Sequence, residues 1–252
     1  MSSLPLQGKV ALVTGSSRAI GAAVVKRLAA DGASVVVNYV SNPDAANAVV
    51  DDIHSSTPGK AIALKGDMSS VPEAENLVEE TIKHYGKIDI LVLNAGIMNP
   101  KLLKDIDEKS YDDHFNMNVK VPLFMVKRAT KYLQPGGRVI FISTSLTKFS
   151  GVPPSYVLYN ATKGAVEQLV RVLAKDLGSN GITVNAVAPG PTNTELFTTG
   201  KSEQLIQFFS SLHPMKRIAE PNEISPVVAM LARDESVWVN GQTIFVNGGY
   251  AV

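Results

Sequence analysis

Tyr159 and Lys163 stand four residues apart in the segment "YNATK". On a helix, residues at this spacing share one face, so the lysine ammonium can approach the phenol. A free phenol has a pKa of about 10, and a nearby cation lowers that pKa by stabilising the phenolate. Such a tyrosine could protonate a carbonyl oxygen as hydride arrives, or take a proton from an alcohol. Taken alone, the pair is most often a solvated helix face, so other segments must support the chemistry.

A group of hydroxyls precedes this pair in "FISTSLTKF" (141–149). The apolar run before it predicts a strand, and Ser143, Thr144 and Ser145 follow at the carboxyl end of that strand. Open α/β sheets place their ligands at such ends. A hydroxyl here could orient a substrate oxygen toward Tyr159, or it could simply cap the next turn.

The segment "TGSSRAIG" (14–21) has the character of a phosphate-binding turn between a strand and a helix. Gly15 permits a tight turn, Gly21 lets the helix pack closely on the sheet, and the helix start favours an anion. Ala19 stands where a glycine is often found. We expect helical backbone without a positive φ at position 19, so that Ala19→Gly changes cofactor affinity by less than tenfold, or about 1.4 kcal/mol. The glycines are six apart, so the turn alone could be an ordinary strand–helix connection.

The end of the second predicted strand indicates which dinucleotide binds. NAD enzymes place an acid there to hold the adenosine ribose, whereas this chain has Asn38 and Tyr39. Arg18 lies in the phosphate turn, where a guanidinium could bind an additional phosphate, although it could also be an ordinary surface arginine. A missing acid together with an added base favours NADP(H).

Short apolar runs alternate with longer segments of helical period, and these elements must position the candidate residues. The runs cover residues 9–14, 34–39, 60–65, 88–93, 138–143, 182–187 and 243–248. Most are apolar nearly throughout, as strands buried on both faces of a parallel sheet should be. The alternation predicts an α/β fold with seven strands and about six helices. In the helix expected at 158–178, an apolar stripe is formed by Ala165, Leu169, Val172 and Leu173.

Residues 1–252 contain no linker or repeat, which favours a single domain. The one long insertion, at about 190–220, separates the sixth strand from a final helix opened by "EPNEIS". It carries three phenylalanines in an otherwise polar stretch. A lid over an apolar or aromatic ketone would explain them, and a helix packed on a neighbouring subunit would do so nearly as well.

Composition limits the classes of partner. The chain has 252 residues, 45% of them hydrophobic, no cysteine and a formal net charge of +1, so we expect no nucleic-acid or membrane partner. No secretory signal or membrane-spanning run is visible, and a cytoplasmic location is expected. His54, His84, His114 and His213 lack metal-ligand spacing, so no catalytic metal is expected.

Together these segments resemble the classical short-chain dehydrogenase/reductase family along essentially the whole chain and in the right order. The segments that carry the resemblance are "TGSSRAIG", "GDMSS" (66–70), "LNAG" (93–96), "NMNV" (116–119), the serine stretch, "YNATK", "VNAVAPGPTNT" (184–194) and "NGQTIFVNGG" (240–249). Ala19 and Leu93 depart from the glycine and asparagine that the family often shows, which bears on cofactor affinity. The resemblance implies a Rossmann-type, doubly wound parallel sheet with helices on both faces. Within this family, the sequence is similar to NADPH-dependent 3-oxoacyl reductases and to hydroxynaphthalene reductase-like members.

The resemblance implies roles for four catalytic residues. Tyr159 would be the general acid/base, Lys163 would lower its pKa and bind the nicotinamide ribose, and Asn118 would hold a water of the proton relay. The family serine often lies thirteen residues before the tyrosine, but that position is Leu146. Members with one extra residue place it fourteen before, which selects Ser145, with Thr144 or Ser143 as the alternatives.

The same comparison implies the binding residues. For the cofactor they are Gly15, Ser17, Arg18, Ile20, Gly21, Asn38, Tyr39, Asp67, Met68, Asn94, Ala95, Gly96, Pro189, Gly190, Thr192 and Thr194, besides Tyr159 and Lys163. For the substrate we expect Leu146, Phe149, Tyr156, Pro191, Phe197 and Phe209, with Met98, Lys148, Val152, Phe208, His213 and Met215 as further candidates.

The expected activity is hydride transfer between NADP(H) and a ketone or secondary alcohol. An NAD-linked alcohol or sugar dehydrogenase and a non-catalytic NADP(H)-sensing protein are the alternatives. The segment "VWVNG" (237–241) and the C-terminal strand resemble the region that forms tetramers in the family, so a homotetramer, or a homodimer, is expected.

Overall fold

A single parallel sheet organises the molecule, and the computed structural model describes residues 4–252. Its strands are β1 (Val10–Val13), β2 (Ser34–Tyr39), β3 (Lys60–Lys65), β4 (Ile90–Leu93), β5 (Arg138–Ile142), β6 (Thr183–Pro189) and β7 (Thr243–Val246). Their order is β3-β2-β1-β4-β5-β6-β7, and every neighbouring pair is parallel. The predicted seven-stranded, doubly wound sheet is confirmed. The direction of winding reverses between β1 and β4, where folds of this kind bind their ligands.

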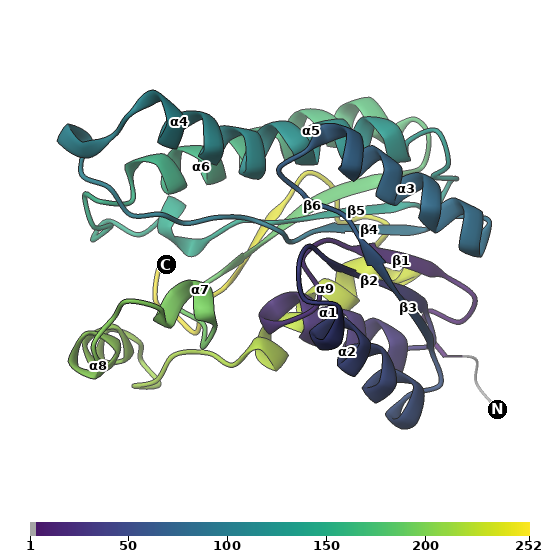
Figure 1. The fold of residues 1–252 in the computed structure, drawn as a ribbon, viewed down its shortest axis with the longest axis horizontal. Helices are drawn as coiled ribbons and strands as arrows, with labels where there is room; N and C mark the ends of the chain where they lie inside the picture. Colours follow the sequence, from purple (N-terminus) through teal and green to yellow (C-terminus); the bar gives the residue numbers. More distant parts are fainter. Residues whose placement is uncertain (1–3) are drawn as a thin grey trace.

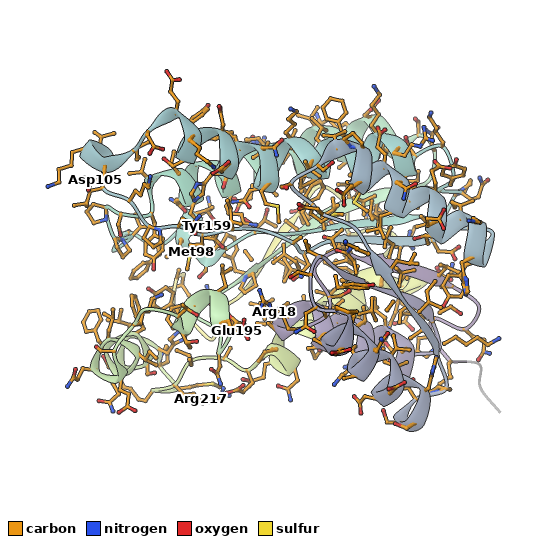
Figure 2. The ribbon with its side chains drawn as sticks, viewed as in Figure 1. Arg18, Met98, Asp105, Tyr159, Glu195 and Arg217 are labelled. Carbon is orange, nitrogen blue, oxygen red and sulfur yellow. The ribbon has the colours of Figure 1, made fainter. Side chains whose placement is uncertain are left out.

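Helices cover both faces of the sheet (Figure 1). They are α1 (Ala19–Ala30), α2 (Pro43–Ser56), α3 (Val71–Tyr85), α4 (Glu108–Phe115), α5 (Val121–Ala129), α6 (Val157–Gly178), α7 (Glu195–Thr198), α8 (Glu203–Leu212) and α9 (Pro221–Ala232). One face carries α1, α2 and α9, and the other carries α3, α5 and α6. Side chains fill the space between these layers and the sheet (Figure 2).

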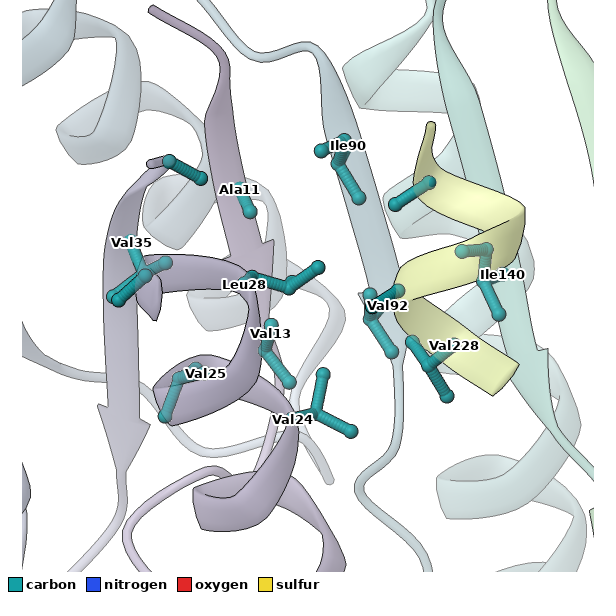
Figure 3. Packing of buried hydrophobic residues seen from close by; sticks show 14 of the residues in the cluster. Ala11, Val13, Val24, Val25, Leu28, Val35, Ile90, Val92, Ile140 and Val228 are labelled. Carbon is teal, nitrogen blue, oxygen red and sulfur yellow. The ribbon is translucent and has the colours of Figure 1, made fainter. Parts of the chain in front are cut away.

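The core forms because successive residues of each strand point to opposite faces. Ala11 and Val13 of β1 face α1 and α9, whereas Leu12 belongs to the cluster under α3, α5 and α6. Figure 3 shows the first cluster, in which side chains of α1 and α9 interlock over β1, β4 and β5. Strands that are apolar on both faces therefore bind two helix layers at once, as their composition predicted.

Side-chain caps explain where several helices begin. Asn42 caps α2 by accepting from the Ala45 N–H at 3.0 Å, and Ser70 accepts from the Glu73 N–H at 3.3 Å at the start of α3. Asp107 caps α4 in the same way. Within residues 4–252, no side chain caps α1, and its first turn carries no acidic residue. The backbone N–H groups at this helix start are therefore not used by a capping side chain.

The apolar stripe predicted on α6 is not the face that packs on the sheet. The residues that pack on the sheet are Val166, Val170, Ala174 and Leu177, whereas Val172 is 67% exposed. Because α6 is apolar on two sides, periodicity alone cannot tell which side meets the sheet. On the second side, Val172 is exposed while Ala165, Leu169 and Leu173 are half-buried.

The expectation of ordinary helical backbone at Ala19 is also wrong. Its φ is +51°, in the left-handed region, directly after an extended Arg18 with φ −158°. This reversal lets the chain leave the turn and enter α1 within two residues. An L-residue adopts such a conformation at a cost of about 1–2 kcal/mol.

We expect Ala19→Val to lower the free energy of unfolding by about 1–2 kcal/mol relative to Ala19→Gly, because a β-branched side chain fits the left-handed region poorly and glycine fits it freely. Urea denaturation of both variants measures the difference. Ala30→Val, an exposed site at the other end of α1, is the control and should cost only a few tenths of a kcal/mol. Equal losses for the two valine variants would contradict the prediction.

Candidate active site

The turn between β1 and α1 brings three segments of backbone into close contact. A Cβ at Gly15 would lie 3.2 Å from Ala95, and a Cβ at Gly21 would lie 2.4 Å from the Gly15 oxygen. The Asn94 side chain holds the turn, since its Nδ2 donates to Thr14 O at 2.9 Å and Gly15 O at 3.0 Å. The glycines are therefore required because larger side chains do not fit.

The uncapped start of α1 completes an anion site. The first four N–H groups of a helix have no partner within the helix, and their dipoles favour a negative charge. With no acidic side chain in the first turn, these groups fit the pyrophosphate of a dinucleotide. Ser17 and Ile20 are half-buried in this turn.

Asn38 has a different position from the one expected of a cofactor ligand. Its side chain is fully buried; Oδ1 accepts from the Gly15 N–H at 2.8 Å and Nδ2 donates to Gly66 O at 3.1 Å. Its backbone N–H donates to Ser16 Oγ at 2.9 Å. All of its polar atoms are used within the protein, so Asn38 positions the turn rather than reaching an adenosine ribose. The half-buried Tyr39 follows it at the strand end.

Arg18 is placed at the mouth of this turn. Its side chain is 71% exposed, and its Nη1 lies 2.7 Å from Oε2 of Glu195, the first residue of α7. Figure 2 shows the two side chains meeting between α1 and α7. The base expected to recognise an extra phosphate is thus paired with a carboxylate from the 190–220 segment.

Tyr159 and Lys163 lie in the first two turns of α6, and both are buried. Lys163 Nζ donates to Ile142 O, at the end of β5, at 2.7 Å, and it lies 5.7 Å from the centroid of the Tyr159 ring. The strand end and the helix therefore fix the ammonium against the phenol ring.

The expected lowering of the Tyr159 pKa is not what the structure gives. Burial raises the pKa of Tyr159 to about 12, and the nearby Thr144 hydroxyl offsets only part of this effect. Burial also lowers the pKa of Lys163 to about 8. Desolvation dominates because both groups are shielded from water and the ammonium faces the ring and a carbonyl. Tyr159 is thus protonated at neutral pH, as an acid that donates a proton must be.

The three hydroxyls after β5 have different surroundings. Ser143 Oγ donates to Glu167 Oε1 at 2.8 Å, so its hydroxyl is already used within the protein. Thr144 accepts from the Leu146 N–H at 3.4 Å and lies near Tyr159. Ser145 Oγ is buried and has no hydrogen-bond partner among residues 4–252. Ser145 is therefore the best placed of the three to receive a substrate oxygen.

Asn118 lies in a π-helical turn, Asn116–Lys120, between α4 and α5. Its Oδ1 accepts from the Ile97 N–H at 2.9 Å, and its Nδ2 donates to Ile97 O at 3.0 Å and to Thr162 Oγ1 at 3.1 Å. A Cβ at Gly96 would lie 3.1 Å from this Oδ1. Asn118 thus joins the loop after β4 to α6, and π turns often occur at functional sites. The sequence carried no signal for the π turn.

A family model described as enoyl-(acyl carrier protein) reductase matches residues 15–251. The chain belongs to the short-chain dehydrogenase/reductase family. A probable tetrahydroxynaphthalene reductase from Zymoseptoria tritici is 40% identical over 254 residues, which cover 96% of this chain and 94% of the relative.

Solved structures of the same family share the fold. A short-chain dehydrogenase/reductase from Serratia marcescens superposes with a TM-score of 0.93 at 33% identity, covering 98% of this chain and all of that one. A short-chain dehydrogenase from Burkholderia cenocepacia, solved in complex with NADP, superposes with a TM-score of 0.90 at 36% identity, covering 98% and 99% of the two chains.

The remaining residues expected at the cofactor lie at strand ends. Asp67 accepts from the Ser69 N–H at 2.8 Å, and Met68 beside it is buried. After β6, a Cβ at Gly190 would lie 3.0 Å from Asn247, Thr192 Oγ1 donates to Gly190 O at 2.9 Å, and Thr194 caps α7. Pro189 is the last residue of β6.

The expected substrate residues differ in how far they are buried. Tyr156, Pro191, Phe209 and His213 are buried, and Leu146, Phe149, Phe197, Met98 and Val152 are half-buried. Phe208 and Met215 are 56% and 68% exposed, and Lys148 is exposed as well, so these three lie at the surface. Phe197 and Phe209 pack edge to face at 5.4 Å, which joins α7 to α8.

Sequence reasoning missed Tyr250. This residue is 6% exposed and stacks on Phe149 at a centroid distance of 4.3 Å. An aromatic residue near the end of a chain gives no periodic signal, so only the packing places it at the site.

Metal-binding clusters and membrane-spanning helices are both absent from residues 4–252. Among residues 4–252, no group of three or more His, Asp or Glu side chains is placed to hold a metal ion. None of the helices in the described part of the chain is long and apolar enough to cross a membrane.

We expect Asn38→Asp to lower the free energy of unfolding by roughly 3 kcal/mol without producing a preference for NADH, because it buries a carboxylate against the carbonyls of Leu64 and Gly66. Urea denaturation measures the stability, and titration with NADH and NADPH measures the preference. Asn99→Asp, the same change at an exposed site, is the control and should be nearly neutral. A stable variant that prefers NADH would contradict the assignment of Asn38 as a positioning residue.

Proposed function

We propose that this chain is an NADP(H)-dependent reductase that transfers a hydride between the nicotinamide and a ketone or secondary alcohol. The observation that carries the proposal is the buried Ser145 hydroxyl, which has no hydrogen-bond partner among the described residues and lies in the loop beside Tyr159. A buried hydroxyl without a partner costs about 1–3 kcal/mol, and a substrate carbonyl would satisfy it.

Tyr159 would be the proton donor in the direction of reduction. Burial raises the pKa of its phenol to about 12, so at pH 7 the phenol carries the proton that the carbonyl oxygen would receive. Ser145 would donate a hydrogen bond to the same oxygen and hold it near Tyr159. When bound, the dinucleotide would supply the hydride, and Lys163 would hold its nicotinamide ribose.

An aromatic ketone is the substrate class that the surroundings favour. Phe149, Tyr156 and Tyr250 gather beside the serine loop, and flat rings pack well on aromatic side chains. Several relatives are named as hydroxynaphthalene reductase-like proteins, at 40% identity over 256 residues. We therefore assign a bicyclic phenolic ketone to this chain.

The preference for NADP(H) rests on Arg18 and on the lack of an acidic residue at the end of β2. Arg18 is the basic group at the phosphate turn, and the buried Asn38 leaves no acid for the adenosine ribose. Glu195 pairs with Arg18 at 2.7 Å, so an incoming phosphate must displace a carboxylate. The ion pair is exposed and worth at most about 1 kcal/mol, whereas a phosphate can take two bonds from a guanidinium.

We infer a homotetramer, or a homodimer, working in the cytoplasm. Trp238 is 95% exposed, Val237 is 57% exposed, and Val172 of α6 is 67% exposed. Apolar groups of this size are usually covered in an assembly, and a symmetric oligomer would cover each patch with a copy of itself. The cysteine-free composition suits a reducing compartment.

We expect Tyr159→Phe to lower kcat/KM for reduction of tetralone by at least about a thousandfold, because it removes the proton donor. Loss of NADPH absorbance measures the rate, and NADPH fluorescence shows that the variant still binds cofactor. Tyr111→Phe, which removes a hydroxyl from a tyrosine that is 48% exposed on α4, is the matched control. If wild type and Tyr159→Phe are equally inert while NADPH binds, the chain is a sensing protein instead.

We expect Arg18→Ala to raise the Kd for NADPH by about 10–100-fold and to leave the Kd for NADH within about threefold, because only NADPH carries the extra phosphate. Glu195→Gln should lower the Kd for NADPH by about two- to fivefold, since it frees the guanidinium. Fluorescence titration with both cofactors measures these values. Equal losses for NADH and NADPH in Arg18→Ala would assign the arginine to the shared pyrophosphate.

A further inference from the structure

Two buried polar side chains near the serine loop have no role in the reaction described above. Tyr250 is 6% exposed and His213 is 3% exposed. Within the part of the chain that the structure describes, neither Tyr250 Oη nor His213 Nε2 has a hydrogen-bond partner. Buried polar atoms are nearly always paired, so an unpaired atom needs an explanation. Two such atoms in adjacent side chains point to a common ligand.

The two side chains belong to one stack of rings. His213 and Tyr250 stack with centroids 4.8 Å apart and an interplanar angle of 24°, and Tyr250 and Phe149 stack at 4.3 Å and 29°. The Phe149 N–H donates to Ser145 O at 3.2 Å. The stack therefore joins the end of the 190–220 segment and the C-terminal residues to the loop that carries Ser145.

Tyr156 links the stack to Tyr159. Tyr156 packs edge to face against Tyr159, with centroids 6.4 Å apart. Burial, with the neighbouring Tyr156 phenol, raises the pKa of Tyr250 to about 12, and Tyr156 acts on Tyr159 in the same direction. Tyr156 thus lies near both phenols, and Tyr250 is neutral at pH 7.

His213 offers a hydrogen-bond acceptor on a ring that stacks against Tyr250. Its Nδ1 faces the backbone at Asn247 and Gly248, since a Cβ at Gly248 would lie 3.6 Å from it. A hydrogen bond to the Asn247 backbone raises the His213 pKa, but burial is the larger effect and keeps that pKa below its ordinary value. A neutral imidazole that donates from Nδ1 keeps a lone pair on Nε2.

We propose that Tyr250 and His213 form a polar subsite that binds a phenolic hydroxyl of an aromatic ketone whose carbonyl lies at Ser145. This rests on the proposed reductase function and names the group by which the substrate is selected. The Tyr250 hydroxyl donates to or accepts from the substrate oxygen, and Nε2 of His213 accepts a hydrogen bond from the phenolic O–H. The stacked rings provide a flat apolar wall for the aromatic part of the ligand.

The charges around the subsite favour a neutral phenol over an anionic group. Arg217 is the cation that acts on His213, and it already binds Glu223 through two contacts of 2.6 Å. A carboxylate or phosphate at Tyr250 would be buried without a free counter-charge from that arginine, which is costly. A phenolic hydroxyl needs only the donor and acceptor that are present.

The test measures binding and turnover with matched ligands. In the presence of NADP⁺, wild type should bind the best of the isomeric dihydroxynaphthalenes at least about tenfold more tightly than naphthol, and Tyr250→Phe should reduce this ratio to within about threefold. The ratio of kcat/KM for ring-hydroxylated tetralone to that for tetralone should change in parallel. His213→Phe, which keeps an aromatic ring on Tyr250, should reduce both ratios as well. Tyr111→Phe is the control and should keep them.

Each outcome separates the subsite from the reductase proposal. Unchanged ratios in Tyr250→Phe would overturn the subsite. If wild type does not consume NADPH with any tetralone, but the binding preference for dihydroxynaphthalene over naphthol still depends on Tyr250, the reductase function is overturned and the subsite is supported. If the Tyr250 hydroxyl had a purely structural role, Tyr250→Phe would lower Tm. An unpaired hydroxyl can be removed without loss of stability. The subsite therefore predicts an unchanged or higher Tm for this variant.

Discussion

The hydrogen bond from the Gly15 N–H to the Asn38 side chain fixes the edge of the sheet on which the site is built. Asn38 joins the turn after β1 to the end of β3 through Gly66, and Asn94 joins the same turn to the end of β4. These two amides hold the ends of four parallel strands in register. Because they satisfy the inner backbone groups of the turn, the outer N–H groups at the start of α1 stay free for phosphate.

The candidate site residues are held at a cost in stability that the rest of the fold offsets. Burial disfavours the charged form of Lys163, although its ammonium has a carbonyl partner. The hydroxyls of Ser145 and Tyr250 lack partners within residues 4–252 and so depart from the rule that buried polar groups are paired. Such departures gather at functional sites. The strands supply the compensation, because they are buried by helices on both faces. The left-handed Ala19 at the phosphate turn belongs to the same pattern of local strain.

The sequence specified the elements better than the directions of side chains. All seven apolar runs became strands because a strand buried on both faces needs no choice of side. A helix with two apolar sides needs such a choice, and on α6 the wrong side was selected, since only tertiary contact decides it. At the end of β2, Asn38 is buried while Tyr39 is half-buried, and residue type alone does not show where the buried part of the strand ends. Backbone φ at Ala19 was equally out of reach, because alanine carries no preference for the left-handed region.

In the proposed reductase, reaction and selectivity would reside in different parts of the molecule. Tyr159, Lys163 and Ser145 lie on or directly after regular elements, whose packing fixes the geometry that the proposed hydride and proton transfer would demand. Phe149, His213 and Tyr250 come instead from three connecting or terminal segments that meet in one ring stack. Loops can change their side chains without disturbing the sheet, so selectivity can vary while the reaction is kept. Arg18 and Glu195 connect the two parts, because their ion pair joins the phosphate turn to the 190–220 segment, which also contains His213.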